Sequence, residues 1–319
     1  MMKVTDRIKQ ERIISIEVLP PSRGHSAEDI FKAVDELKTD YPISFINVTR
    51  HAAETTYVEF EDGTIAKVPK VKRPGTVGLT AALMKRYSVD VVPHVLCRGM
   101  NKFELEDLLI DLHLIGVQNV FAIRGEYENA QGESKQENNK DNHTYTVELV
   151  QQIADMNKGH YLYQKESTMS TDFCIGVAGY PEKHFEAPNL EEDMKHLKEK
   201  VEAGADYIIT QMVFDFDVYK DFVERAKSIG INVPIIPGIK PVVSLKSIYS
   251  IPRKFFVNIP HAFLEKMQEA KSSKEEFEVG TAFMASLVEK LLSWGAPGLH
   301  LFTMGKSKSA KALLQAVWR

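Results

Sequence analysis

The sequence predicts a single-domain (β/α)₈ barrel, and three observations support that prediction. Eight short, almost continuously apolar runs recur along the chain, amphipathic segments separate them, and glycine follows the end of several of these segments. Apolar runs without alternation are typical of parallel strands that are buried on both faces. The chain has 319 residues, and α/β barrels of about 250 residues form one domain.

The eight strands are expected at 14–20, 44–49, 89–97, 119–125, 173–180, 207–213, 234–239 and 298–304. Between them, Ser26 is expected to begin a helix, with Asp29 three residues on in the arrangement of a capping box. Residues 101–115 and 190–201 carry apolar side chains at helical spacing, opposite charged faces. Glycine follows a helix end in LIG, EAGA, SIG and SWGAPG, where it takes the left-handed conformation without a Cβ penalty.

A closed barrel is favoured over a doubly wound open sheet, because no Gly-x-Gly-x-x-Gly follows the first strand. Two polar stretches, 127–143 and 157–172, interrupt the alternation of strands and helices. Both are expected to be long loops, either mobile or lying over a site.

Composition narrows the class of protein. The net charge of −4, with Lys and Arg spread along the chain, argues against nucleic-acid binding. Cys97 and Cys174 lie in apolar runs, which favours buried thiols in a reducing compartment. No Cys-x-x-Cys or His-x-x-x-His spacing indicates a metal site. The charged N-terminus and the lack of an apolar run near roughly 20 residues predict no signal peptide, no membrane span and a cytoplasmic location.

Polar residues recur where the predicted strands end, and barrel active sites form at the C-terminal ends of the strands. They are Glu17, Thr49, Arg50, His94, Arg124, Glu126, Tyr180, His184, Gln211, Thr303 and Lys306. Each alone can be explained structurally, for example His94 as a hydrogen-bonded core histidine. Their shared placement at one end of successive strands favours a functional site.

Glu17 is the sharpest candidate, because it interrupts the apolar run IISIEVLP. Carboxylates are almost never buried unless they are paired, and a desolvated carboxyl has a raised pKa that suits a general acid. The structural alternative is a salt bridge from Glu17 to Arg124 inside the barrel.

At these residues the chain resembles the methylenetetrahydrofolate reductase family over nearly its whole length. The matching stretches are SIEVLPP, NVTRHA, VPHVLC, AIRGE, VAGYPEKHFEA, EEDMKHLKEKVEAGADYIITQMVFD, IIPGIKP and GLHLFTMGK. The resemblance is to the short bacterial form, without the C-terminal regulatory domain of the eukaryotic form. It implies a homo-oligomeric enzyme that uses FAD and NAD(P)H to reduce methylenetetrahydrofolate to methyltetrahydrofolate in ping-pong order, supplying methyl groups for methionine synthesis.

The resemblance also implies roles for individual residues. Glu17 matches the acid that protonates N10 of the folate. The implied flavin contacts are Thr49, Arg50, Ala52, His94, Arg124, Gly125, Glu126, Thr146, Tyr180, His184, Ala187, Asp193, His196, Glu199 and Lys200. The implied substrate contacts are Glu126, Gln211, Ser247 and Lys306, of which Gln211 is shared by folate and nicotinamide.

Several positions depart from the family pattern. Glu126 replaces the usual Asp, Lys306 replaces the usual Arg, and Ser247 stands where some relatives carry Gln. An extra methylene at Glu126 and the loss of a bidentate partner at Lys306 affect flavin and folate binding. Three alternatives therefore stay open: a flavin-free reductase of the same family, a pterin-binding barrel methyltransferase, and a barrel kept as a scaffold for a partner.

Overall fold

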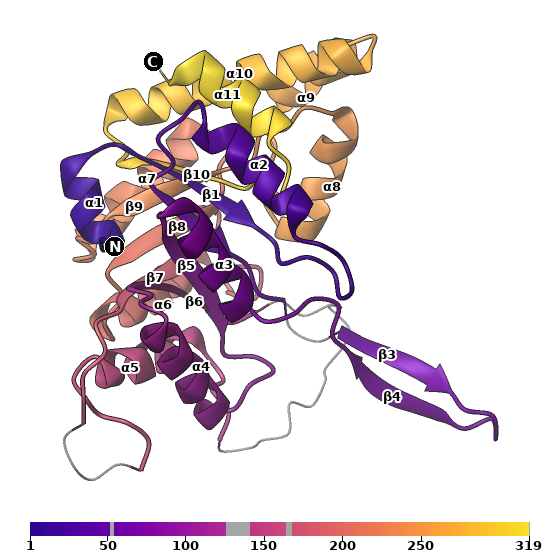
Figure 1. Cartoon of the computed structure of the whole chain (residues 1–319). Coiled ribbons are helices and arrows are strands. Elements are labelled where there is room, and N and C mark those ends of the chain that lie inside the picture. The colour runs from indigo at the N-terminus through magenta and orange to yellow at the C-terminus, as the bar shows by residue number, and fades with distance from the viewer. Residues whose placement is uncertain (52–53, 126–140, 164–167, 319) are drawn as a thin grey trace.

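The barrel predicted from the sequence is confirmed in a computed structural model, which describes residues 1–51, 54–125, 141–163 and 168–318 (Figure 1). Eight parallel strands close into a ring in the order β1-β10-β9-β8-β7-β6-β5-β2. They are β1 (Ile13–Val18), β2 (Phe45–Val48), β5 (Asp90–Leu96), β6 (Asn119–Ile123), β7 (Cys174–Gly179), β8 (Tyr207–Met212), β9 (Ile235–Ile239) and β10 (Gly298–Leu301).

All eight predicted strands are present, but most of the predicted runs continue past the observed C-terminal ends. The run at 298–304, for example, ends as a strand at Leu301, and the run at 119–125 ends at Ile123. The residues of these runs that lie beyond the observed strands follow the C-terminal ends of the strands, at the mouth of the barrel. The overrun therefore falls at the end of the barrel where the candidate site lies.

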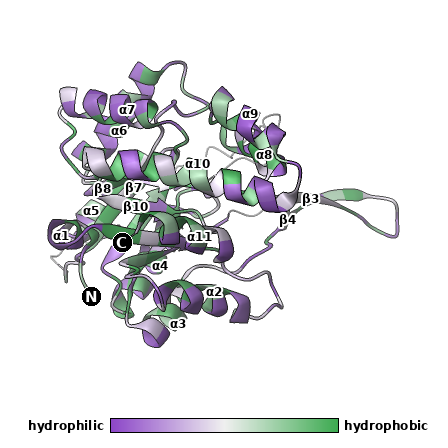
Figure 2. Cartoon of the chain, turned by 90° about the horizontal axis from the view of Figure 1, so that it is seen from above, coloured by the Kyte–Doolittle hydropathy of each residue, from purple (hydrophilic) through white to green (hydrophobic). Residues whose placement is uncertain are grey.

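The helices surround the barrel (Figures 1 and 2). They are α1 (Val4–Gln10), α2 (Glu28–Lys38), α3 (Val77–Tyr87), α4 (Lys102–Leu114), α5 (Thr146–Met156), α6 (Leu190–Glu202), α7 (Phe216–Ser228), α8 (Leu245–Phe255), α9 (His261–Glu269), α10 (Ser273–Trp294) and α11 (Lys308–Val317). The connection from β9 to β10 thus contains three helices in succession.

Local sequence explains where individual helices begin and end. The Asn101 side chain accepts hydrogen bonds from the backbone N–H groups of Phe103 and Glu104, and this capping box begins α4, the helix expected over 101–115. The capping box expected at Ser26 and Asp29 is wrong. There α2 begins at Glu28, and the Ser26 hydroxyl accepts from the Glu28 N–H at 3.1 Å, one residue before the helix cap.

The predicted glycine stops are confirmed. The glycines of LIG, EAGA, SIG and SWGAPG that follow helix ends are Gly116, Gly204, Gly230 and Gly295, and all four have positive φ. At Gly204, φ is +124° and an added Cβ would lie 2.9 Å from the Ala154 side chain. Only glycine fits that turn without strain.

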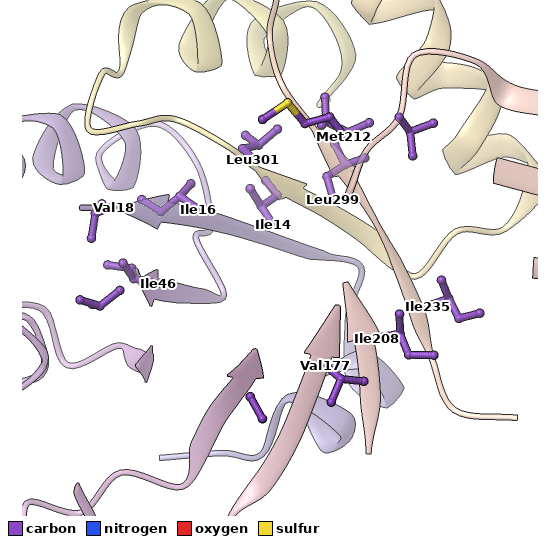
Figure 3. Packing of buried hydrophobic residues seen from close by; sticks show 14 of the residues in the cluster. Ile14, Ile16, Val18, Ile46, Val177, Ile208, Met212, Ile235, Leu299 and Leu301 are labelled. Atoms are coloured by element: carbon purple, nitrogen blue, oxygen red, sulfur yellow. The ribbon is translucent and has the colours of Figure 1, made fainter. Parts of the chain in front are cut away.

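Side chains along β1 alternate between two apolar clusters, one outside the barrel and one inside it. Ile14, Ile16 and Val18 face the surrounding helices and belong to the large apolar layer between strands and helices (Figure 3). Ile13 belongs to the cluster in the barrel interior, and Glu17 shares its side of the strand because side chains alternate with period two. The register of the strand therefore directs Glu17 into the barrel.

The N-terminal end of the barrel is closed by α1. Its residues Val4 and Ile8 pack on the interior cluster, which also contains Phe45, Phe121 and Tyr207. The Val4 N–H donates to the Asn119 side chain at 2.8 Å. These contacts leave the opposite, C-terminal end as the mouth.

One element was not predicted. Strands β3 (Glu54–Glu59) and β4 (Ile65–Lys70) pair antiparallel as a hairpin that extends away from the barrel after β2 (Figure 1). The signal was present, because an Asp-Gly step separates two runs rich in β-branched and aromatic residues.

The predicted loops are tested only in part. Of the stretch 157–172, the described residues form neither helix nor strand, as expected. Most of 127–143 lies outside the described residues. Cys97 and Cys174 are buried and unpaired with each other, as predicted. Among the residues that the structure describes, no helix is both long and apolar enough to cross a membrane.

Candidate functional site

Glu17 lies at the centre of a ring of polar side chains inside the mouth of the barrel. Its Oε2 atom is 4.0 Å from Nε2 of His94 on β5 and 3.9 Å from Nε2 of His300 on β10. Parallel register brings them together, since Glu17 pairs with Asn47 on β2 and His300 pairs with Ser15. All five side chains are buried. The salt bridge from Glu17 to Arg124, which was the structural alternative to a catalytic role, is not formed; Arg124 pairs instead with Glu186.

The pKa of Glu17 differs in direction from the sequence-based expectation. Burial raises it, but the close approach of His300 and the charges of His94, His300 and His51 lower it more, so the pKa lies below its ordinary value. The expectation of a raised pKa considered burial alone. In the free protein Glu17 is therefore a carboxylate at neutral pH.

His94 is a neutral histidine at pH 7. Burial lowers its pKa to about 4, despite the opposing effect of Glu17, and His300 and His51 lower it further. Asn47 Nδ2 lies 3.2 Å from His94 Nε2, which assigns Nε2 as acceptor and places the proton of the ring on Nδ1. The ring also packs against Phe121, with 4.9 Å between centroids.

Ser15 holds His300 in the same tautomeric form as His94. The Ser15 hydroxyl is 3.3 Å from the Leu299 carbonyl and 2.9 Å from His300 Nδ1. If the hydroxyl donates its one proton to the carbonyl, it accepts from Nδ1–H, and Nε2 is left facing Glu17.

Sequence reasoning missed His300, Ser15 and Asn47 because it searched the ends of strands, whereas these residues lie within them. It also missed Lys240, directly after β9. Lys240 donates to the Phe302 carbonyl at 2.9 Å. Burial lowers its pKa to about 8, with Glu17 opposing that effect and Lys306 adding to it. Its position after an apolar strand in IIPGIKP was the available signal.

A second group of side chains forms a cationic cluster after β5, β6 and β7 and on α6, made up of Arg98, Arg124, Lys183, His184 and Lys200. Burial lowers the pKa of His184 to about 4, and the charges of Arg124, Lys200, Lys183 and Arg98 lower it further. Four positive charges therefore surround one neutral ring. Tyr180 stands edge-on to that ring, with 4.7 Å between centroids.

Lys200 anchors this cluster from α6. Its ammonium donates to the Ala178 carbonyl at 2.8 Å. Burial lowers its pKa to about 8, although nearby Asp193 acts in the opposite direction. Asp193 itself accepts from the His184 N–H at 2.9 Å. The cluster thus contains a buried, only partly compensated positive charge.

The comparisons with known proteins give the family directly. The methylenetetrahydrofolate reductase family model matches residues 3–317.

The chain belongs to the methylenetetrahydrofolate reductase family.

Its relatives in this family are distant. The 5,10-methylenetetrahydrofolate reductase of Salmonella typhimurium is 27% identical over 302 residues, covering 94% of this chain and 88% of that protein. Methylenetetrahydrofolate reductase 1 of Schizosaccharomyces pombe is 29% identical over 324 residues, covering 98% of this chain but 48% of that protein. The chain thus spans about half the length of its eukaryotic relatives and most of the bacterial one.

A solved structure shares the fold. It is an uncharacterized protein from Clostridium thermocellum that binds two copies of 5-methyl-5,6,7,8-tetrahydrofolic acid. The TM-score is 0.61 and the identity 14%, over 98% of this chain and 96% of that one. At this identity the likeness supports the barrel fold alone.

The family-implied residues that follow β2 and β6 lie at the mouth. The Thr49 side chain is buried, and its hydroxyl has no hydrogen-bond partner among the described residues. Arg50 is half-buried, and burial lowers its pKa. Gly125 has φ of +94°, and an added Cβ would lie 3.1 Å from Leu96. Ala52 and Glu126 lie outside the described residues.

The remaining implied flavin contacts divide into two groups. Thr146 begins α5, and the Ala187 N–H donates to the His184 carbonyl at 3.0 Å, which keeps Ala187 beside the cationic cluster. The side chains of His196 and Glu199 face solvent on α6 and lie 3.0 Å from each other. The structure does not bring these two residues into the cationic cluster. Their exposure and mutual contact are those of an ordinary solvent-facing helix surface.

The three implied substrate residues that the structure describes lie on or directly after elements at the same end of the barrel. Gln211 on β8 accepts from the Met212 N–H at 3.0 Å and lines a small pocket with Tyr180 and Phe256. Ser247, in the first turn of α8, lies 2.8 Å from the Ser244 hydroxyl. Lys306 is exposed, and its N–H donates to the Thr303 carbonyl at 3.0 Å.

Proposed function

We propose that this protein reduces 5,10-methylenetetrahydrofolate to 5-methyltetrahydrofolate, with FAD as its cofactor and NAD(P)H as the source of hydride. The observation that carries this proposal is the buried carboxyl of Glu17, held between two histidines in the mouth of a barrel of this family. A carboxyl so placed can give a proton to a substrate nitrogen that covers the mouth.

The residues present fit FAD. The unpartnered Thr49 hydroxyl is a buried polar group that a ligand would satisfy. The cationic cluster with its buried Lys200 has the charge that a pyrophosphate needs, and Arg124 supplies the forked donor suited to phosphate. Tyr180 and His94 offer aromatic surface on different strands of the mouth. When bound, FAD would supply the hydride chemistry that no side chain can provide.

In this proposal the side chains at the mouth control the transfer of one proton from Glu17 to the substrate. Glu17 is ionised in the free protein, because the histidines outweigh burial. A planar ring bound over the mouth removes water from the carboxyl, and further burial raises its pKa. The substrate thereby shifts Glu17 toward its protonated form, from which it protonates N10 and opens the methylene bridge. Neutral His94, whose Nε2 atom accepts from Asn47, does not compete with Glu17 for the proton.

The departures at Glu126 and Lys306 keep the flavin-free alternative worth testing. Purified protein is reconstituted with FAD, and its visible absorption is followed anaerobically while NADH, NADPH and then methylenetetrahydrofolate are added. An oxidised-flavin spectrum that bleaches with the nicotinamide and returns with the folate supports the proposal.

Protein that stays colourless after reconstitution, yet oxidises NAD(P)H when the folate is added, would instead establish the flavin-free reductase. Transfer of a methyl group to cobalamin, with no oxidation of NAD(P)H, would establish the methyltransferase. No activity in either assay would leave the scaffold. The cytoplasmic location expected from the sequence remains a prediction, which fractionation of the source cells tests.

A further inference from the structure

Lys240 is a half-buried lysine directly after β9. Its ammonium donates to the Phe302 carbonyl at 2.9 Å. Among the residues that the structure describes, this carbonyl is the only hydrogen-bond acceptor of the ammonium, and no carboxylate forms a salt bridge with it. An ammonium has three donors. Two donors of a partly desolvated cation are therefore left for water or for a ligand.

The strand register turns Lys240 toward the mouth of the barrel. Ile236 belongs to the interior cluster, and Gly238 pairs with the inward-facing His300. Side chains alternate along a strand with period two, so Lys240 continues this inward series. The charge of Glu17 also raises the pKa of Lys240, in opposition to burial. The ammonium thus faces the same space as the carboxyl of Glu17.

Lys240 and Glu17 stand at one level of the barrel, two strands apart. Leu301 pairs with Ile16 on one side (Figure 3) and with Ile239 on the other. The next residues of the two outer strands are Glu17 and Lys240. Neighbouring strands lie about 4.8 Å apart, so roughly 10 Å separates the two backbones. Glu17 and Lys240 can therefore meet two different parts of one substrate.

Lys306 brings a second positive charge to this side of the mouth. It follows a tight turn in which Met304 and Gly305 have φ of +52° and +75°. Its N–H donates to the Thr303 carbonyl at 3.0 Å. A methionine is uncommon in the left-handed region, so the turn is strained. The charge of Lys306 lowers the pKa of Lys240, so the strained turn holds two like charges near each other.

Two neighbouring ammonium groups have the charge of a site for an anion. Among the described residues, no carboxylate forms a salt bridge with either Lys240 or Lys306. A lysine is a point charge, so two of them are needed to hold both oxygens of a carboxylate in a fixed direction. The cationic cluster, which suits phosphates, lies across the ring after β5, β6 and β7. The lysine pair is therefore a separate anion site, available to a second ligand.

We propose that Lys240 and Lys306 together bind a carboxylate in the glutamate tail of the folate. This inference rests on the proposed function and names the part of the substrate that the two lysines recognise. In the substrate a benzoyl group separates N10 from the glutamate, which agrees with the separation of Lys240 from Glu17 along the mouth. A tail held by the lysines fixes the position of N10 over Glu17. Lys240 then determines specificity for folates with a charged tail.

Equilibrium binding to the full chain, reconstituted with FAD, tests the inference with two probes. They are 5-methyltetrahydrofolate and its diamide, in which carboxamides replace both carboxylates of the glutamate. The wild type should bind the folate more tightly than the diamide. Lys240→Met should weaken binding of the folate by about 10- to 100-fold, since a charge-assisted hydrogen bond is lost, and leave binding of the diamide unchanged. Lys240→Arg should restore most of the affinity.

Lys306→Met should act like Lys240→Met, and the matched control is Lys195→Met on α6, which should bind both probes as the wild type does. Unchanged binding of the diamide also shows that a variant is folded. A lysine that only ties β9 to β10 would affect both probes alike, and that result would overturn the inference. So would equal affinity of the wild type for the two probes.

A separate titration with NADH distinguishes the other source of negative charge. Weaker binding of NADH to Lys240→Met, with unchanged binding of the folate, would assign the lysines to the phosphates of the nicotinamide donor and overturn the inference. Each of these results leaves the proposed reduction in place. A wild type that binds neither folate probe would instead overturn the proposed function, and the site for the glutamate with it.

Discussion

The Oε2 atom of Glu17 lies 3.9 Å from Nε2 of His300, although the two residues stand near opposite ends of the chain. The first and last strands of the barrel pair directly, with Ser15 opposite His300. Closure of the barrel therefore creates the pair, and the ionisation of Glu17 depends on it. The protonation chemistry of the site is a consequence of ring closure rather than of any local motif.

Glu17→Gln is expected to abolish reduction of methylenetetrahydrofolate while reduction of bound flavin by NAD(P)H continues. The amide keeps the size of the side chain but has no proton to give. A loss of about 10²–10⁴-fold in the folate half-reaction is expected, because general acids contribute that much. Stopped-flow absorbance of the two half-reactions measures the effect. Equal loss in both half-reactions would count against the role of acid.

His300→Asn should shift the pH dependence of the folate half-reaction. The close approach of His300 lowers the pKa of Glu17, so its removal raises that pKa. A general acid works while protonated, so the activity that declines with rising pH should persist to higher pH in the variant. The control is His25→Asn, at an exposed histidine. An unchanged profile would show that His300 does not set the ionisation of Glu17.

Lys200→Met should weaken FAD binding by about 10- to 100-fold, in line with the loss of a charge-assisted hydrogen bond. Burial lowers the pKa of Lys200 to about 8, so the ammonium loses its proton above that pH. FAD affinity of the wild type should therefore fall as pH rises through about 8, and the variant should lack that decline. Fluorescence titration measures both, with the exposed Lys195→Met as the matched control.

Thr49→Val is expected to have opposite effects on the free and the loaded protein. A buried hydroxyl without a partner costs about 1–3 kcal/mol, so its replacement by methyl should raise the unfolding temperature without FAD. The extra stabilisation that FAD gives should become smaller, because the ligand loses a polar contact. Thermal unfolding with and without FAD tests both signs. Destabilisation of the free protein would show that the hydroxyl has a partner there.

Gly176→Ala should destabilise the barrel by about 1–3 kcal/mol or more, as overpacked cores do. An added Cβ would lie 2.3 Å from the Tyr207 ring and 2.7 Å from Phe121. Gly78→Ala on α3 is the matched control, since nothing lies within 4 Å of its added Cβ. That change should stabilise the helix slightly. Denaturant unfolding compares the two, and equal effects would contradict the packing of the barrel interior.

The comparison of sequence with structure separates local from non-local information. The apolar runs predicted the eight strands because burial on both faces leaves a pattern within each strand. Asn101 and the glycines marked helix ends through contacts within a few residues. The direction of the Glu17 pKa was wrong because His300 approaches it only when the ring closes. Burial is visible in a sequence, but the partner that offsets burial is not.

The residues missed within strands were missed for a similar reason. Only the strand register shows that the polar side chains of Ser15, Asn47 and His300 share the inner face of the barrel with Glu17. The β3–β4 hairpin differs, because its signals are local. An Asp-Gly turn between two runs rich in β-branched residues predicts a hairpin without any knowledge of the barrel.

The closure of the N-terminal end by α1 has a kinetic consequence. Beneath the ring of polar side chains lies an apolar floor that includes Ile13, Phe45 and Tyr207, and the Tyr207 hydroxyl has no partner among the described residues. This apolar floor contains no chain of hydrogen-bonding groups that could conduct a proton. Protons can therefore reach Glu17 only through the opening that a bound substrate occupies. Glu17, a carboxylate in the free protein, must then take up its proton while the substrate enters, before the opening is closed. When the substrate is loaded in one solvent, light or heavy water, and the complex is then diluted into the other, the solvent isotope effect on the folate half-reaction should follow the loading medium.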